Sequence, residues 1–260
     1  MADMQIIILV IFILGIVYAV KFLSKKKKVA VADAVPVLLQ KTLKDLVPFY
    51  QQLSEEKQTE FEERAARFLT QVRITGVKTQ VEEIDRVLIA ASAIIPIFNF
   101  PEWEYGNLNE VLLYPDSFDH EYKQEGTGRN ILGMVGSGPM NHVMILSQHE
   151  LRQAFINKTG KENTAIHEFV HLLDKSDGDT DGIPEYFLNK KYIVPWLQLI
   201  QQEIKKITDN ESDINPYGAT NEAEFFAVVS EYFFERPALL KEKHPQLYDA
   251  LQKIFAVPPQ

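Results

Sequence analysis

The chain has 260 residues, a formal net charge of −9, 46% apolar residues and 24% charged residues. It contains no cysteine, which excludes disulfides and thiolate metal sites, so any zinc must be bound by nitrogen and oxygen ligands. Lys21 and the run Lys25 to Lys28 concentrate positive charge near the N-terminus, and the rest of the chain is correspondingly more acidic. A body of this charge argues against nucleic acid as a partner.

An apolar run from Ile6 to Val20, extended by Phe22 and Leu23, opens the chain. A helix over residues 4–23 would rise about 30 Å, which is roughly the hydrocarbon thickness of a bilayer. A cleaved signal peptide would carry positive charge before its apolar core, whereas here only Asp3 precedes it and the lysines follow. A buried core helix is the other alternative, but four consecutive lysines at its end suit a membrane interface better.

We therefore predict one N-terminal transmembrane helix that enters the lipid bilayer through residues 4–23. Residues 1–28 form the membrane anchor with its basic flank, residues 29–35 a linker, and residues 36–260 one domain. Because the lysines follow the apolar segment, the positive-inside rule predicts a single-pass membrane protein with its N-terminus outside and its large domain in the cytoplasm.

Helical periodicity dominates the first part of this domain. The segment LLQKTLKDLVPFYQQL predicts a helix that is interrupted near Pro48. Ser54 is a favourable N-cap for a second helix, EEKQTEFEERAARFLTQV, which has two glutamates in its first turn. A third helix, VEEIDRVLIAASAIIPI, should end near Pro96, and its apolar composition predicts a central position.

The middle of the chain has the composition of β-structure. VLLYPDSF predicts a short strand, and NILGMVGSGPMNHVMILS predicts a hairpin around Gly136 to Pro139. Helical patterns return at about 163–174, 185–208, 221–235 and 238–255. Helices, a few strands and then helices again predict an α+β fold, mostly helical with a small β-sheet.

Residues 165–174 read AIHEFVHLLD, with two histidines four residues apart and a glutamate after the first. On a helix His167 and His171 project from one face, and Glu168 lies about 100° away, close enough to contact a water bound by a shared metal. This pattern is typical of zinc hydrolysis, in which zinc acidifies its water and the glutamate transfers protons. The alternative is an apolar packed helix that happens to carry two imidazoles, whose buried polar groups would then need other partners.

A catalytic zinc site needs a further protein ligand and one open position. Glu224, at the start of the apolar segment EFFAVVSEYFFE, is the candidate, because the remaining histidines lie in no comparable pattern. Asn221 and Glu224 also fit a helix-capping box. The sequence therefore leaves two roles open for Glu224, metal ligand and capping residue, and the two are compatible. The histidines outside any such pattern are His120, His142, His149 and His244.

Five motifs resemble those of the Mlc titration factor A-like zinc peptidases: HEFVHLLD, DG-x-P, NPYGA, EFFAV-x-SEYFFE-x-P and YPDSF. The resemblance covers about residues 36–257. The tyrosine seven residues before Glu224 also resembles the catalytic domain of anthrax lethal factor, a gluzincin. The resemblance implies a zincin-like metallopeptidase domain with one Zn²⁺ per chain. It implies His167, His171 and Glu224 as zinc ligands, Glu168 as general base and acid, and Tyr217 as hydrogen-bond donor to the oxyanion.

Four secondary candidates follow from position. Asp174 shares the face of the two histidines, so that it either orients a ligand, caps a helix end or is an ordinary solvated carboxylate. Glu231 shares the face of Glu224 and is a candidate acceptor for the second N–H of a zinc histidine. DGDTDG at 177–182 resembles the start of an EF-hand loop but has Leu188 at the twelfth position, which favours a plain acidic turn over a calcium site. Residues 142–147 are the candidate strand edge for pairing with an extended peptide, or simply core β-structure.

The sequence thus predicts a membrane-tethered zinc peptidase that hydrolyses peptides with metal-activated water. The family resemblance implies aminopeptidase-like cleavage and an association with a transcriptional repressor. The alternatives are a regulatory module that captures that repressor or another cytosolic partner, and a zinc hydrolase that acts on substrates other than peptides.

Overall fold

The computed structural model describes residues 37–124, 128–136 and 138–255. The predicted membrane anchor, basic flank and linker lie outside these ranges, so that the anchor and its topology stay predictions. Among the helices of the described ranges, none has both the length and the apolar composition needed to cross a membrane.

Four helices precede most of the sheet: α2 (Val37–Leu46), α3 (Pro48–Gln51), α4 (Glu55–Gln71) and α5 (Glu83–Ile97). Pro48 begins α3, so the predicted interruption is observed, and the hydroxyl of Ser54 caps α4 by accepting from the backbone N–H of Lys57. Pro96 lies in the last turn of α5, near the predicted end. Almost the whole of α5 is buried, as its composition predicts for a central helix.

The sheet has four strands in the order β1-β2-β4-β3: β1 (Arg73–Gly76), β2 (Glu110–Tyr114), β3 (Gly133–Val135) and β4 (Val143–Ser147). β1, β2 and β4 are parallel, whereas β3 and β4 form the predicted antiparallel hairpin. Of the two alternatives for residues 142–147, the structure shows core β-structure and not a free edge, because β4 pairs with β2 on one side and β3 on the other. The edge strand on this side is β3, which packs against α7.

The second half is helical: α6 (Gln148–Ile156), α7 (Thr164–Asp174), α8 (Ile193–Thr208), α9 (Glu222–Glu235), α10 (Pro237–Lys243) and α11 (Pro245–Phe255). Short 3-10 segments are η1 (Gly138–Met140), η2 (Lys175–Asp177), η3 (Lys190–Tyr192) and η4 (Pro216–Ala219). Two predicted boundaries are wrong. The helix predicted from residue 185 begins at Ile193, and the helix predicted over 238–255 is two helices, because Pro245 cannot continue α10.

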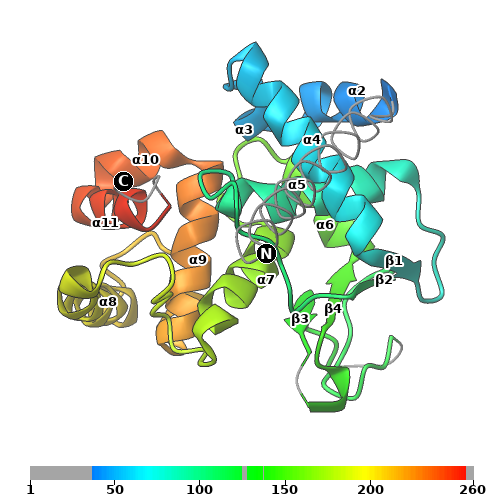
Figure 1. Cartoon of the computed structure of the whole chain (residues 1–260). Helices are drawn as coiled ribbons and strands as arrows, with labels where there is room; N and C mark the ends of the chain where they lie inside the picture. Colours follow the sequence, from blue (N-terminus) through cyan, green and yellow to red (C-terminus); the bar gives the residue numbers. More distant parts are fainter. Residues whose placement is uncertain (1–36, 125–127, 137, 256–260) are drawn as a thin grey trace, which may run out of the picture.

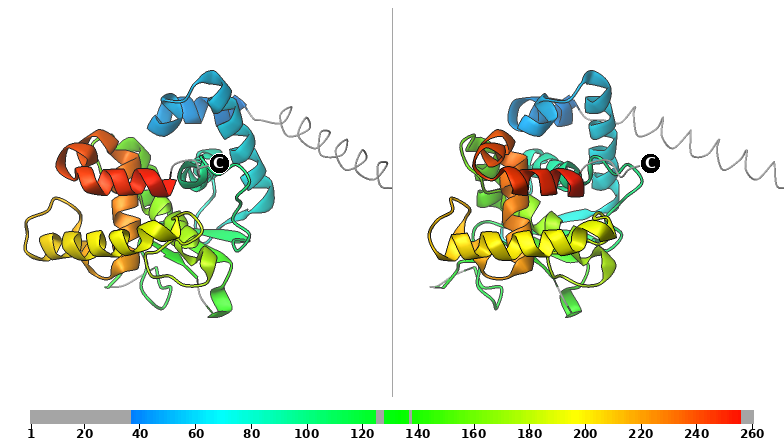
Figure 2. Two further views of the ribbon diagram at one scale, coloured as in Figure 1. Left: turned by 60° about the vertical axis from the view of Figure 1, so that its left-hand side comes forward. Right: turned by 90° about the vertical axis from the view of Figure 1, so that its left-hand side faces the viewer.

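Helices α7 and α9 lie side by side at the centre of the molecule (Figure 1). α5 and β3 also pack against α7, whereas α8, α10 and α11 cover the side of α9 turned away from the sheet (Figure 2). Phe169 and Val170 of α7 and Phe225 and Phe226 of α9 are fully buried in the main apolar core. This packing holds the first two turns of α7 and the first turn of α9 rigidly beside each other, next to the edge strand of the sheet.

Candidate metal centre

Helix α7 presents the two histidines to one point. Asn163 is its N-cap, and its side-chain oxygen accepts from the backbone N–H of Ile166 at 3.1 Å. The Nε2 atoms of His167 and His171, one helical turn apart, are 3.1 Å from each other. The helix therefore brings both imidazoles together without help from any other element, as the four-residue spacing predicts.

Helix α9 supplies the third side chain from its first turn. The side-chain oxygen of Asn221 accepts from the backbone N–H of Glu224 at 2.9 Å, which caps the helix. The Glu224 carboxylate contacts the histidines instead: its Oε2 atom is 3.0 Å from Nε2 of His167 and 3.4 Å from Nε2 of His171. Of the two roles that the sequence leaves open, the backbone of Glu224 takes part in the cap and its side chain faces the imidazoles.

The donor set fits a divalent cation. One ligand atom from each of His167, His171 and Glu224 lies within 4.8 Å of the others, and no other group of three or more such side chains does so in the described part of the chain. Nδ1 of His167 is 2.7 Å from Oε1 of Glu231, and an ionised carboxylate only accepts, so the proton is on Nδ1. When a cation displaces the proton of Nε2, the lone pair of this atom points toward the other two ligand atoms and is available as a ligand.

The predicted supporting role of Glu231 agrees with this geometry. Its second oxygen accepts from the backbone N–H of Asn163, so one carboxylate from α9 holds both the start of α7 and the ring of His167. Asn163 in turn donates its side-chain amide to Glu235, also on α9, at 2.8 Å. These last two contacts could not be predicted from the sequence, because both depend on how α7 and α9 pack.

The charges of the site favour a positive species between the ligands. Burial lowers the pKa of His167, but Glu231 and Glu224 outweigh it and raise this pKa to about 10. Burial raises the pKa of Glu224, yet its hydrogen bonds to His167 and His171 bring this pKa well below the ordinary value. The same negative charge that attracts a proton also attracts a metal ion, and the two compete for one place.

Glu168 is held in a narrow space between α7 and β3. The residue is only 5% exposed, and burial, as the largest influence, raises the pKa of its carboxyl group above the ordinary value. A Cβ atom on Gly133 of β3 would lie 2.7 Å from both Cγ and Oε1 of Glu168. Only glycine leaves room for the carboxylate in this position, a requirement that the sequence pattern did not reveal.

Tyr217 lies on η4, across the site from α7. Asn215 caps this turn by accepting from the backbone N–H of Tyr217 at 2.9 Å. The Tyr217 side chain is about half exposed, and its ring centroid is 6.0 Å from that of His167. Partial burial, followed by the charges of Glu224 and Glu168, raises the pKa of its hydroxyl, so it stays a hydrogen-bond donor at neutral pH.

These side chains line one open cleft of about 750 Å³. Its walls come from β3, α7, the loop at 180–183, η4 and the first turn of α9. His120, which belongs to no motif, also lines the cleft, whereas His142, His149 and His244 do not. The described lining residues are His120, Ile131, Gly133, Met134, Val135, His167, Glu168, His171, Lys175, Thr180, Asp181, Ile183, Leu197, Tyr217, Asn221, Glu222, Ala223 and Glu224.

The two remaining acidic candidates have structural contacts. Asp174 is fully buried, so it is not a solvated carboxylate, and its Oδ2 atom accepts from the backbone N–H of Gly182 in the following loop at 2.9 Å and caps no helix end in the described ranges. Within this loop Asp177 and Asp181 accept backbone N–H groups of residues further along. Among the described residues, the acidic turn at 177–182 contributes to no cluster of metal-ligand geometry.

A helix with His-Glu-x-x-His and a carboxylate from a neighbouring helix form the arrangement of metal-dependent hydrolases. The chain belongs to the family described as glucose-regulated metallo-peptidase M90, whose profile matches residues 22–256. The family implies a metal, and the three converging side chains are the place that the described structure offers for it.

Several relatives extend this likeness over most of the chain. An uncharacterized protein of Synechocystis sp. is 30% identical and covers 92% of this chain and 90% of its own length. Mlc titration factor A of Pectobacterium atrosepticum is 28% identical, and the protein of the same name from Escherichia fergusonii is 30% identical. Each of these two covers 82% of this chain and 84% of its own length, which confirms the family predicted from the motifs.

Proposed function

We propose that this chain is a zinc-dependent peptidase with one zinc ion held by His167, His171 and Glu224. The observation that carries the proposal is that these three ligand atoms converge in a cleft that also contains the buried carboxylate of Glu168. Two imidazoles and one carboxylate are a common catalytic zinc set that leaves a position open for water or substrate. When bound there, zinc supplies a Lewis acid that polarises a carbonyl group and acidifies water.

The chain's own residues would divide the remaining work. Glu168 would take a proton from the attacking water and return it to the leaving amine. Tyr217 would donate its hydroxyl to the oxyanion of the tetrahedral intermediate, where negative charge develops. Glu231 would keep His167 in the tautomer that presents Nε2 as ligand.

Two variants test the metal and the chemistry separately. Glu224→Ala is expected to lose stoichiometric zinc in metal analysis of the purified protein, whereas Glu222→Ala, in the same helical turn, should keep it. Glu168→Gln is expected to keep zinc and lose at least about 100-fold in kcat on peptide substrates, since a positioned general base contributes that much. Full turnover by zinc-loaded Glu168→Gln would refute the mechanism.

We further propose that cleavage is aminopeptidase-like, on the basis of the family resemblance. The test compares one chromogenic peptide with a free and with an acetylated N-terminus. A loss of at least about tenfold in kcat/KM on acetylation supports recognition of the free amine, which corresponds to about 1.4 kcal/mol of transition-state binding. Equal rates would indicate endopeptidase action, and turnover of esters but not of peptides would indicate another class of hydrolase.

A second candidate function is capture of a repressor protein, which the name of the relatives, Mlc titration factor A, favours. In that case Glu168 would be dispensable, because holding a partner does not require a general base beside the histidines. The discriminating experiment measures capture of a purified repressor before and after zinc removal by a chelator. Capture that survives both chelation and Glu168→Gln would support binding as a separate function.

We also propose that residues 4–23 anchor the chain in a membrane and leave the peptidase domain in the cytoplasm. The apolar length and the lysines that follow support this proposal. Protease added outside intact cells should leave the domain uncut, whereas digestion there would reverse the topology.

A further inference from the structure

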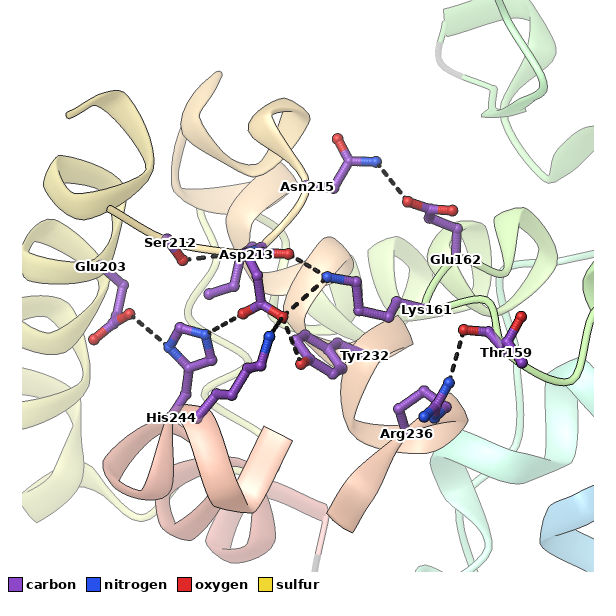
Figure 3. Close-up of polar contacts among 12 residues, drawn as sticks. Thr159, Lys161, Glu162, Glu203, Ser212, Asp213, Asn215, Tyr232, Arg236 and His244 are labelled. Carbon is purple, nitrogen blue, oxygen red and sulfur yellow. Dashed lines mark hydrogen bonds and ion pairs between the residues drawn. The ribbon is translucent and has the colours of Figure 1, made fainter. Parts of the chain in front are cut away.

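A second polar cluster lies outside the cleft and centres on Asp213, in the loop between α8 and η4 (Figure 3). Its Oδ2 atom accepts from Nζ of Lys243 at 2.9 Å, from the hydroxyl of Tyr232 at 3.0 Å and from Nζ of Lys161 at 3.2 Å. Its Oδ1 atom is 2.8 Å from Nε2 of His244. Lys161 donates to the backbone carbonyl of Asp213 as well.

The partners of Asp213 come from separate parts of the fold. Lys161 precedes α7, Tyr232 lies on α9, and Lys243 and His244 lie where α10 meets α11. His244 continues the cluster to α8, because its Nδ1 atom is 3.3 Å from Oε2 of Glu203. The Asp213 side chain is thus tied directly to α9 and α10, and through His244 to α8.

The hydrogen-bond donors around Asp213 determine the pKa of its carboxyl group. Burial alone would raise the pKa of Asp213, but hydrogen bonds from Lys243, His244, Lys161 and Tyr232 hold this pKa well below its ordinary value. A carboxylate that accepts four hydrogen bonds cannot move without leaving several donors unpaired, which makes the position of this loop costly to change.

The loop leads directly to Tyr217. Ile214, next to Asp213, is buried at 2% exposure, and Asn215 donates its side-chain amide to Glu162 at 3.2 Å while it caps η4. Lys161 and Glu162 are consecutive and precede the N-cap of α7, so the same short segment holds the loop at two points. The loop thereby fixes the start of η4 relative to α7, which carries the histidines.

Tyr217 lies on η4, a short turn that packs against α8 and α9. Its side chain is half exposed, and the next residue, Gly218, packs its backbone against α9 near Val228. Its position over the cleft depends on this packing and on where η4 begins. The contacts of Asp213 and Asn215 hold that start.

We propose that Asp213 is a positioning residue that holds Tyr217 over the cleft through the loop 213–216. The proposal rests on the proposed peptidase function, in which Tyr217 steadies the oxyanion. Asp213 touches no cleft residue, so it acts only through the backbone that joins it to η4.

The first experiment measures steady-state kinetics of zinc-loaded Asp213→Asn on a peptide substrate. Asparagine keeps the size of the side chain but has one acceptor oxygen for four donors. We expect kcat to fall about tenfold with KM and zinc content unchanged, which is less than the roughly 100-fold loss expected for Tyr217→Phe from removal of an oxyanion donor. Asp209→Asn, in the same loop but exposed and without a side-chain contact, is the matched control and should match the wild type.

A double variant separates positioning from general damage. In the Tyr217→Phe background, Asp213→Asn is expected to lower kcat by less than about twofold, because the hydroxyl that it positions is absent and the two effects are coupled. Equal losses in both backgrounds would refute the proposal. If Asp213→Asn does not fold, Lys161→Met removes one donor and tests the same cycle, with exposed Lys158→Met as its control.

Hydrogen exchange gives a reading that does not depend on peptide hydrolysis. Asp213→Asn should accelerate exchange of the backbone amides in the segment 214–220, where Pro216 has none, relative to Asp209→Asn, and leave those of α7 unchanged. Absence of turnover in the wild type would refute the proposed function, whereas unchanged exchange at 214–220 would refute the role of Asp213.

Discussion

Gly133→Ala is the substitution whose effect follows most directly from the geometry of the site. A Cβ atom at this position would lie 2.7 Å from Cγ and Oε1 of Glu168 and 2.8 Å from Cγ2 of Thr164. Carbon and oxygen atoms do not approach so closely, so both side chains must move. The Glu168 side chain can rotate, whereas β3 is held by its hydrogen bonds to β4.

Gly133→Ala is expected to lower the stability of the protein only slightly but its activity strongly. Overpacking by one methyl group destabilises a protein by about 1–3 kcal/mol, and rotation of a side chain toward the cleft keeps the cost near the lower end. A displacement of about 1 Å in a catalytic group lowers a rate by roughly 100-fold. We therefore expect kcat of Gly133→Ala to fall by about that factor while the protein remains folded and zinc-loaded.

The assay is kcat on a peptide substrate together with urea unfolding and metal content. Gly106→Ala is the matched control, because its new Cβ atom would meet no atom within 4 Å. In a Glu168→Ala background, Gly133→Ala should cost less stability than in the wild type, since most of the conflict is removed. Turnover of Gly133→Ala within about twofold of Gly106→Ala would show that Glu168 is not constrained by β3.

Three further outcomes are expected. Glu231→Gln should weaken zinc affinity about 10- to 100-fold in competition with a chelator, because glutamine has no charge and only one acceptor oxygen for the two donors, His167 Nδ1–H and Asn163 N–H; an unchanged affinity would contradict this role. The hydrogen bond to Glu203 raises the pKa of His244, and Asp213 adds to this effect. The stability that His244 contributes is therefore complete below the pKa of this group in the unfolded chain, and it is lost as the pH rises through the pKa in the folded protein. The unfolding free energies of wild type and His244→Gln should therefore differ more at pH 6 than at pH 9, and a difference independent of pH would be contrary evidence. Removal of zinc should lower the melting temperature, which excess zinc restores; an unchanged melting temperature would argue against binding at a folded site.

Local sequence was sufficient for the histidine pair, because α7 is one continuous helix and its geometry alone places His167 beside His171. It was also sufficient to propose Glu224 and Glu231, since both lie on one face of an apolar helix seven residues apart. It could not decide where the Glu224 side chain points, because capping and metal binding use the same position. The packing of α9 against α7 decided this.

The strands were harder to place. The hairpin of β3 and β4 has a turn signal and was predicted, but β1 was missed, because four residues without a flanking turn motif look like the end of a helix. The order of the strands depends on the parallel pairing of β2 with β4, a contact between distant segments that no local pattern encodes. For that reason the sequence left open whether residues 142–147 form an edge or a core strand, and only the pairing shows that the edge is β3.

The order of residue types along the chain determined the helices, the family and the side chains available for chemistry, because helical periodicity and motif spacing are local properties. Tertiary structure alone decided which carboxylate supports which imidazole, why residue 133 must be glycine, and which donors converge on Asp213. These relations join residues tens of positions apart, and they exist only after apolar burial has brought α7, α9 and the sheet edge into contact.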